Sequence, residues 1–296
     1  MVSQLTDIKS LLSHSALLEK AIDQLHALIP PNGQLLLKLN LLATLLETDD
    51  IDKLSVIASS TGCYSYRNIQ ASATIKAIRI QAEIASRTSD ETSNVLVCDL
   101  DDFDADRHWE GKQIGIYKER KVLVEWKTCS DELSIGESIH RIAGVARLLH
   151  QTGITRPRDL ITPDCLGYFV NENKPLSMGI VYALPSTYSE GLPRSLFQLL
   201  AEKGTDPSLW PSLDQRRNLA RVLARAVFQL HVVGWLHKGI RPQNIMFIGE
   251  NRYFETPYLI GFDYARKEGY EEKTESTDLA FNLYRHPSAQ GEVRSR

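Results

Sequence analysis

The stretch HVVGWLHKGIRPQNIMF, residues 231–247, places polar side chains in a loop between two apolar segments. Its apolar flanks predict a helix that ends at Gly234 and a strand over Ile245–Ile248. In the loop, Asn244 offers an amide oxygen that can ligate a metal ion bridging phosphate groups. Gly239 has no side chain, so it can neither accept a proton nor orient an attacking oxygen. By itself the stretch predicts a helix–loop–strand connection whose loop carries an amide and no carboxylate.

A second candidate group is the carboxylate of Asp263 in LIGFDYAR, residues 259–266. An aspartate oxygen is a ligand that magnesium prefers. The alternative interpretation is that Asp263 is a solvated turn residue or forms an ion pair with Arg266. Both interpretations stay open from the sequence.

A third candidate is Lys127 in VLVEWK, residues 122–127, which is rich in valine and predicts a strand. A lysine on a strand can bind an anion, and a glutamate of the following helix can form an ion pair with it. Glu137 is the best-placed partner and Glu132 the next. The alternative is a strand lysine that faces solvent.

Residues 1–92 are predicted to form a helical, bundle-like region. Apolar residues recur at spacings of three and four over residues 3–29, and Pro30–Gly33 is a strong helix stop. Further helices are predicted over residues 34–47, 51–58 and 66–85. Because amphipathic helices must cover their apolar faces, we expect a small bundle or docking region.

Residues 93–296 are predicted to form a second domain, which makes the chain an α+β protein. Strands are predicted for NVLVCDL (94–100) and KVLVEWKTC (121–129), and for the two sides of a polar turn at Asn171–Lys174. Helices are predicted over residues 132–151, 196–202 and 213–233.

The aspartate-rich run DLDDFDADRHWEGK, residues 99–112, raises the question of a metal loop. Its spacing does not match a calcium-binding loop, because no glycine followed by glutamate completes the pattern. We therefore expect a solvated acidic loop. The four cysteines form no CxxC pair, so no zinc site is predicted either.

The composition is that of an ordinary globular chain, with 43% hydrophobic and 24% charged residues and a net charge of −3. The basic residues are dispersed, so no nucleic-acid partner is predicted. The start of the chain lacks the charged-then-apolar order of a signal peptide. The most apolar stretch, Leu35–Leu46, is too short for a membrane span, which takes about 20 residues. We expect a cytoplasmic protein without a membrane span.

Four segments, taken in order, resemble protein-kinase motifs. The loop at 237–244 resembles the catalytic loop H-R-D-L-x-x-x-N, with His237 and Asn244 at its ends and Gly239 in place of the catalytic aspartate. LIGFDYAR resembles the D-F-G motif, with Gly261 where the magnesium-binding aspartate stands. Asp263 lies two residues later, about 6.6 Å along an extended chain. It therefore cannot replace that ligand without a large backbone shift.

The other two matches are VLVEWK, which resembles the strand that carries the phosphate-binding lysine, and LYRHPS, residues 283–288, which resembles the end of the activation segment. The glycine-rich phosphate loop is poorly matched, with Gly111 and Gly115 alone at its place. Over residues 112–290 the chain thus resembles the protein-kinase fold. Within that fold it is similar to fungal kinase-like proteins that carry an N-terminal helical domain.

The resemblance implies a kinase-like small lobe and an incomplete large lobe, preceded by the helical region. A large lobe would continue through several supporting helices after Arg296, so we expect that the domain is truncated at its C-terminal end or that another protein covers the apolar surface left exposed. We therefore expect a protein partner, or a homo- or hetero-oligomer, that covers this surface.

The implied function is that of a pseudokinase, a catalytically impaired binding, scaffold or regulatory module in fungal signalling. ATP would bind weakly and without magnesium through Lys127, Glu137, Asn244 and Asp263. One alternative is an active atypical kinase that transfers phosphate from ATP with the help of Asp263 or an acid of residues 99–106. Another is a helical interaction protein with a remnant kinase domain.

Overall fold

The computed structural model contains helices and antiparallel sheets, which confirms the α+β class. The chain divides into two compact units, Met1–Glu91 with Gly153–Arg158, and Thr92–Thr152 with Asp159–Arg296. The structure describes residues 27–59, 66–88, 96–128, 135–150, 157–171, 177–186, 188, 191–203, 210–249, 254, 256–267 and 283–284.

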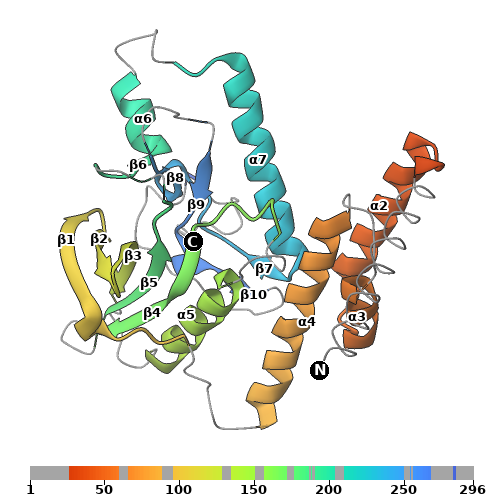
Figure 1. Ribbon diagram of the computed structural model, residues 1–296, viewed down its shortest axis with the longest axis horizontal. Helices are drawn as coiled ribbons and strands as arrows, with labels where there is room; N and C mark the ends of the chain where they lie inside the picture. The colour runs from red at the N-terminus through yellow and green to blue at the C-terminus, as the bar shows by residue number, and fades with distance from the viewer. Residues whose placement is uncertain are drawn as a thin grey trace, which may run out of the picture. The chain divides into compact units, whose positions relative to one another are not determined.

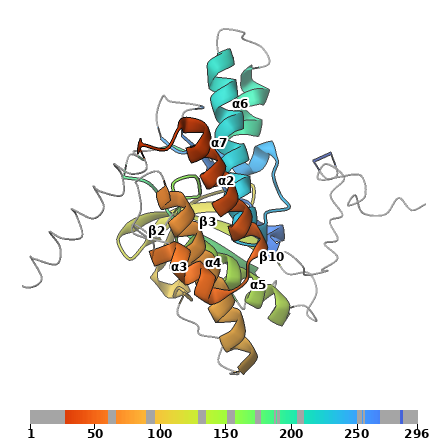
Figure 2. The same cartoon turned by 90° about the vertical axis from the view of Figure 1, so that its right-hand side faces the viewer.

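The first unit contains three described helices (Figure 2), namely α2 (Pro31–Glu47), α3 (Ile51–Ser59) and α4 (Arg67–Thr88). The helices predicted for these three segments are confirmed. The helix predicted over residues 3–29 lies outside the described residues except at its end. Asp50 caps α3, because its Oδ1 accepts hydrogen bonds from the backbone N–H groups of Asp52 and Lys53.

A buried lysine joins α4 to the end of α2. Lys76 is 3% exposed, and its Nζ donates to the carbonyl oxygens of Leu45 at 2.6 Å and Leu46 at 3.2 Å. Asp49 lies 3.3 Å from the same Nζ. The positive charge is therefore stabilised by the carbonyl end of α2 and by one carboxylate.

The second unit is built on a five-stranded antiparallel sheet of order β1-β2-β3-β5-β4 (Figure 1). The strands are β1 (Phe103–Trp109), β2 (Lys112–Tyr117), β3 (Arg120–Thr128), β4 (Asp164–Asn171) and β5 (Ser177–Ala183). Helix α5 (Ile135–Leu149) lies between β3 and β4 in sequence and contacts β4 and β5. The predictions of β3, α5, β4 and β5 are confirmed.

Alternation along β3 separates two faces of the sheet. Val122 and Val124 pack into an aromatic cluster around Phe169, whose ring lies 5.3 to 6.0 Å from the rings of Phe103, Tyr117 and Trp126. Glu125 and Lys127 belong to the opposite face. That face therefore carries charge into a buried environment.

Two predictions for residues 94–112 are wrong. The described part of the strand predicted over 94–100 forms a single bridge, Val97 to Tyr168, and then the short 3₁₀ helix η2 (Leu100–Asp102). The predicted acidic loop is instead η2 and the edge strand β1, because Phe103 packs on Phe169 and the backbone pairs with β2. An edge strand tolerates charged side chains because one of its sides faces solvent.

The rest of the second unit supplies two further helices, short strands and turns. Helix α6 (Leu196–Lys203) and helix α7 (Leu213–Val232) confirm the two predicted helices, and Ser212 and Gln215 form a capping box at the start of α7. The remaining elements are β6 (Arg194–Ser195), β7 (Trp235–Leu236), η6 (Pro242–Asn244), β8 (Ile245–Phe247), β9 (Pro257–Leu259), η7 (Phe262–Tyr264) and β10 (Arg266–Lys267).

Short strands hold these segments together. β8 pairs with β6 and β9, and β7 pairs with β10. This pairing brings the loop before η6 next to the residues that precede η7. Among the described residues, no helix is long and apolar enough to cross a membrane.

Candidate ligand pocket

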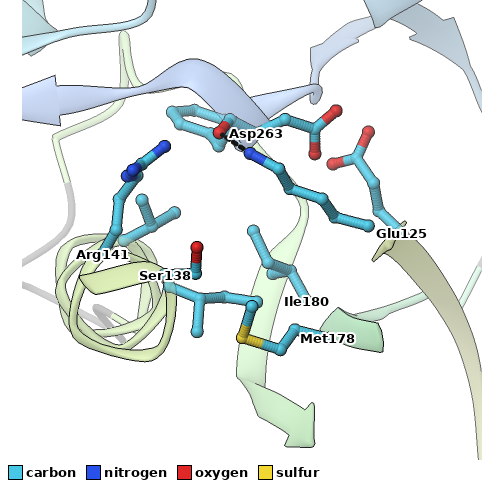
Figure 3. Close-up of a pocket in the computed structure, with 10 residues that line it drawn as sticks. Glu125, Ser138, Arg141, Met178, Ile180 and Asp263 are labelled. Carbon is cyan, nitrogen blue, oxygen red and sulfur yellow. Dashed lines mark hydrogen bonds between the residues drawn. The ribbon is translucent and has the colours of Figure 1, made fainter. Parts of the chain in front are cut away.

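A pocket of about 370 Å³, including its open mouth, lies between β3, β5, α5 and η7 (Figure 3). Its apolar walls are Ile142, Val145, Met178, Ile180 and Phe262, and its polar groups are Glu125, Lys127, Ser138, Arg141 and Asp263. A small set of polar groups on apolar walls is typical of a ligand site.

Strand β3 holds the turn at η7 through two hydrogen bonds. The N–H of Gly261 donates to Oε2 of Glu125 at 3.0 Å, and Nζ of Lys127 donates to the carbonyl oxygen of Asp263 at 2.9 Å. The Lys127 ammonium also lies 5.0 Å from the centre of the Tyr264 ring, within the range of a cation–π contact. Lys127 is half-buried in the pocket, so the solvent-facing alternative is wrong.

The glutamate predicted to pair with Lys127 cannot be placed in the same way. The backbone of Glu137 lies in α5, and its side chain lies outside what the structure describes, as does all of Glu132. From α5, the described side chains of Ser138 and Arg141 reach the pocket, and Arg141 points into it in Figure 3. The acid that is described beside this lysine is Glu125, on the same strand.

Glu125 and Asp263 form a pair of carboxylates that point toward one another (Figure 3). The pKa of the buried Glu125 is raised from 4.5 to about 7, mainly by loss of water and in addition by the charge of Asp263, against the opposing effect of Lys112. Lys112 is buried and lies opposite Glu125 in the register of β2 and β3. The sequence analysis did not name Glu125 or Lys112 as candidate site residues. An acid among the apolar residues of a strand, as at Glu125, was a usable signal.

Asp263 is neither fully solvated nor paired with Arg266. It is half-buried, and burial raises its pKa while the charges of Lys127, Lys112 and Arg241 lower it. The two carboxylates of the pocket are thus surrounded by three cations.

On the other side of the turn, a chain of hydrogen bonds connects the residues of the predicted catalytic loop. Asn244 Nδ2 donates to the carbonyl oxygen of Gly239 at 2.8 Å, and the Gly239 N–H donates to Nδ1 of His237 at 3.1 Å. His237 Nε2 lies 3.1 Å from the carbonyl oxygen of Ile260. Because Nδ1 accepts, Nε2 carries the proton and donates. Burial lowers the pKa of His237 to about 4, so the imidazole is neutral near pH 7.

Gly261 leaves no room for a side chain. Its φ of +85° is in the left-handed region, and a Cβ at this position would overlap the side-chain amide of Asn244. Gly239 is less restricted, since a Cβ there would lie 3.0 Å from the carbonyl oxygen of Gly261. An aspartate at position 261 is therefore excluded unless Asn244 moves and gives up its bond to Gly239.

The structure thus brings Lys127 and Asp263 together in the pocket and places Asn244 behind Gly261, outside the pocket lining. Gly115 is explained by strand packing, because a Cβ there would overlap the Phe103 ring and the carbonyl oxygen of Asp104 on β1. Within the described part of the chain, no group of three or more His, Cys, Asp or Glu residues is arranged to hold a metal ion.

No protein-family model matches this chain, and no curated protein matches it.

Proposed function

We propose that this chain is a catalytically impaired protein-kinase-like protein that acts as a binding, scaffold or regulatory module, in fungal signalling as the sequence resemblance suggests. The order of the five-stranded sheet, the position of α5 after β3 and the lysine of β3 beside a pocket are in keeping with a kinase-like small lobe. Helix α7, the loop at η6 and the turn at η7 follow in the order of the catalytic part of a large lobe.

The packing of Gly261 against Asn244 is the observation that carries this proposal. Phosphoryl transfer in kinases depends on an aspartate that holds magnesium and on a second aspartate that accepts the substrate proton. The first cannot fit at position 261, and Gly239 supplies no carboxylate for the second. Losing one such group costs orders of magnitude in rate, so efficient transfer is not expected.

Weak nucleotide binding without magnesium is part of the proposal. Lys127 would hold the phosphates, and to do so it would exchange its bond to the Asp263 carbonyl for a bond to the ligand. The carboxylates of Glu125 and Asp263 line the same pocket and would repel the phosphates. Three cations near these carboxylates also disfavour a magnesium ion beside them.

A thermal-shift titration of the full chain with ATP, with and without magnesium, tests this proposal. We expect a small rise in Tm that does not depend on magnesium and is lost in Lys127→Ala. Arg120→Ala is the matched control, because Arg120 is an exposed cation at the other end of β3. A magnesium-dependent rise, or transfer of labelled phosphate that disappears in Lys127→Ala, would overturn the proposal.

An active atypical kinase is the second candidate, because Asp263 lines the pocket and is not a solvated turn residue. If Asp263 held a metal ion, Asp263→Asn would abolish phosphate transfer supported by magnesium or manganese. Transfer that is absent from the start, or that survives Asp263→Asn, counts against this candidate.

A helical interaction protein with a remnant kinase domain is the third candidate. Five leucines of α2 are exposed on the surface, as in a docking helix, namely Leu35, Leu36, Leu37, Leu39 and Leu46. This candidate gains if residues 1–92 fold and bind a partner alone, while residues 95–296 are soluble only with that partner.

A further inference from the structure

Helix α7 carries a row of exposed arginines. Arg217, Arg221 and Arg225 repeat every four residues, which places them along one side of the helix, and Arg216 adjoins the row. Four arginines stand against one acid, Asp214, so the helix has an excess of three positive charges. No carboxylate of the described residues pairs with the four guanidinium groups. The whole chain, in contrast, is negatively charged.

Apolar side chains extend this row at both ends. Leu213 is 63% exposed and Phe228 is 37% exposed, and spacings of four and three connect them to Arg217, Arg221 and Ala224. This α7 stripe, Leu213 to Phe228, is about 22 Å long at a rise of about 1.5 Å per residue. A surface that combines arginine with exposed leucine and phenylalanine is typical of an interaction site.

The same compact unit carries a surface of opposite charge. Five aspartates of η2 and β1 and of the residue before them are exposed, namely Asp99, Asp101, Asp102, Asp104 and Asp106. Local cations neutralise two of them, because Lys118 pairs with Asp102 at 3.4 Å and Arg107 pairs with Asp106 at 3.3 Å. In the described part of the chain, Asp101 and Asp104 have no such cation.

This acidic edge also has exposed apolar neighbours. Ile116, which lies opposite Asp104 in the register of β1 and β2, is 45% exposed, and Val97 is exposed before η2. Charged side chains on an edge strand prevent another strand from adding to the sheet. They leave the side chains available for a surface of opposite charge, so the acidic edge complements the α7 stripe in both charge and apolar content.

We propose that the α7 stripe of one copy of this chain docks on the acidic edge of a second copy. Where two copies make this contact once, the contact is heterologous, and the pair keeps one free stripe and one free edge. In this head-to-tail arrangement further copies add beyond the dimer. Neither surface includes the pocket between β3, α5 and η7, so the proposal does not depend on the proposed function.

Sedimentation velocity of the full chain as a function of salt and protein concentration tests this proposal. In about 20 mM salt we expect an average mass that rises with concentration past that of a dimer. In about 0.5 M salt, where the screening length falls below about 5 Å, we expect the monomer. A monomer in low salt, or association that salt does not weaken, would overturn the proposal.

Charge reversal identifies the two surfaces. Arg217→Glu with Arg221→Glu, and separately Asp101→Lys with Asp104→Lys, should each abolish self-association, while an equimolar mixture of the two variants should restore it. Glu47→Lys with Asp52→Lys is the control, since it changes the net charge as much as the acidic-edge variant at exposed sites of α2 and α3. The control should associate like the wild-type chain. Failure of the mixture to associate, or an equal loss in the control, would contradict the proposed contact.

Discussion

The two sides of the turn at η7 differ in what they leave for a ligand. On one side, Gly261 packs on Asn244. The polar groups of Asn244, Gly239 and His237 are hydrogen-bonded to one another and to the Ile260 carbonyl. On the other side, Lys127 and Glu125 reach a pocket that is open to solvent. We call the first the filled side, because Asn244 occupies its space, and the second the open side, because its charged groups line the pocket.

This difference separates polar groups that the protein uses for its own packing from polar groups that line a pocket. A glycine in the left-handed region allows a neighbouring side chain, here Asn244, to occupy the space that a larger residue at position 261 would need. On the open side no side chain fills the space in this way. Lys127 and Glu125 hold the turn at η7 with hydrogen bonds that a ligand could replace. Stability and binding are therefore expected to respond differently to changes on the two sides.

The largest effect is expected for Gly261→Ala, on the filled side. The new methyl group would overlap Asn244 and the backbone would be strained at φ +85°, so we expect a loss of at least about 3 kcal/mol in the free energy of unfolding. Gly191→Ala is the control, because φ is +105° there and a Cβ would meet no atom within 4 Å. It should cost about 1 kcal/mol, from backbone strain alone. Equal losses by urea unfolding would show that Asn244 does not fill the site.

A pH dependence is expected on the open side, from Glu125. Its pKa is raised from 4.5 in the unfolded chain to about 7 in the folded chain, so the folded state binds more protons between these values. The stabilisation from protonated Glu125 is complete below about pH 4.5 and is lost as the pH rises through about 7. The loss is on the order of 3 kcal/mol.

The measurement compares wild type with Glu125→Gln by urea unfolding at about pH 5 and about pH 8. The glutamine resembles the protonated acid, so the variant should gain stability relative to wild type as the pH rises. His237 acts in the opposite direction, because its lowered pKa costs stability as the pH falls toward about 4. It is present in both proteins and cancels in the comparison. A difference that does not change with pH would mean that Glu125 is ionised throughout.

The helices of this fold were predictable, because their signals are local. Residues 213–233 were predicted and α7 is Leu213–Val232, since the capping residue Ser212 and the turn at Gly234 mark its ends. The edge strand β1 was not predictable in the same way. Its aspartates hide the alternation, and its pairing with β2 and the packing of Phe103 on Phe169 are tertiary contacts.

The candidate site was predictable only in part, for the same reason. Lys127 and Asp263 could be chosen from their motifs, and they line one pocket. Glu125 was missed because its partner, the N–H of Gly261, is 136 residues away in the sequence. The filling of the space at Gly261 by Asn244 also depends on the pairing of β8 with β9, which brings the two segments together.

A smaller effect is expected for Gly239→Ala, on the filled side. A Cβ at Gly239 would lie 3.0 Å from the carbonyl oxygen of Gly261 and 3.3 Å from Asn244 Nδ2, so a shift of a few tenths of an ångström relieves the contact. We expect a loss of about 1 kcal/mol in the free energy of unfolding, partly offset by the lower entropy of the unfolded chain. A loss as large as that of Gly261→Ala would show that the whole filled side is rigid.

The smallest effect on stability is expected for Lys127→Met, on the open side. The lysine donates to the Asp263 carbonyl and lies over the Tyr264 ring, and water can reach that carbonyl oxygen through the pocket, so we expect a loss of about 1 kcal/mol. Lys76→Met is the matched control, because Lys76 donates to two carbonyl oxygens and is 3% exposed. It should cost about 2 to 3 kcal/mol, since these acceptors lose their partner where water has little access. The same loss for both lysines in urea unfolding would mean that Lys127, like Lys76, serves mainly to hold the fold together.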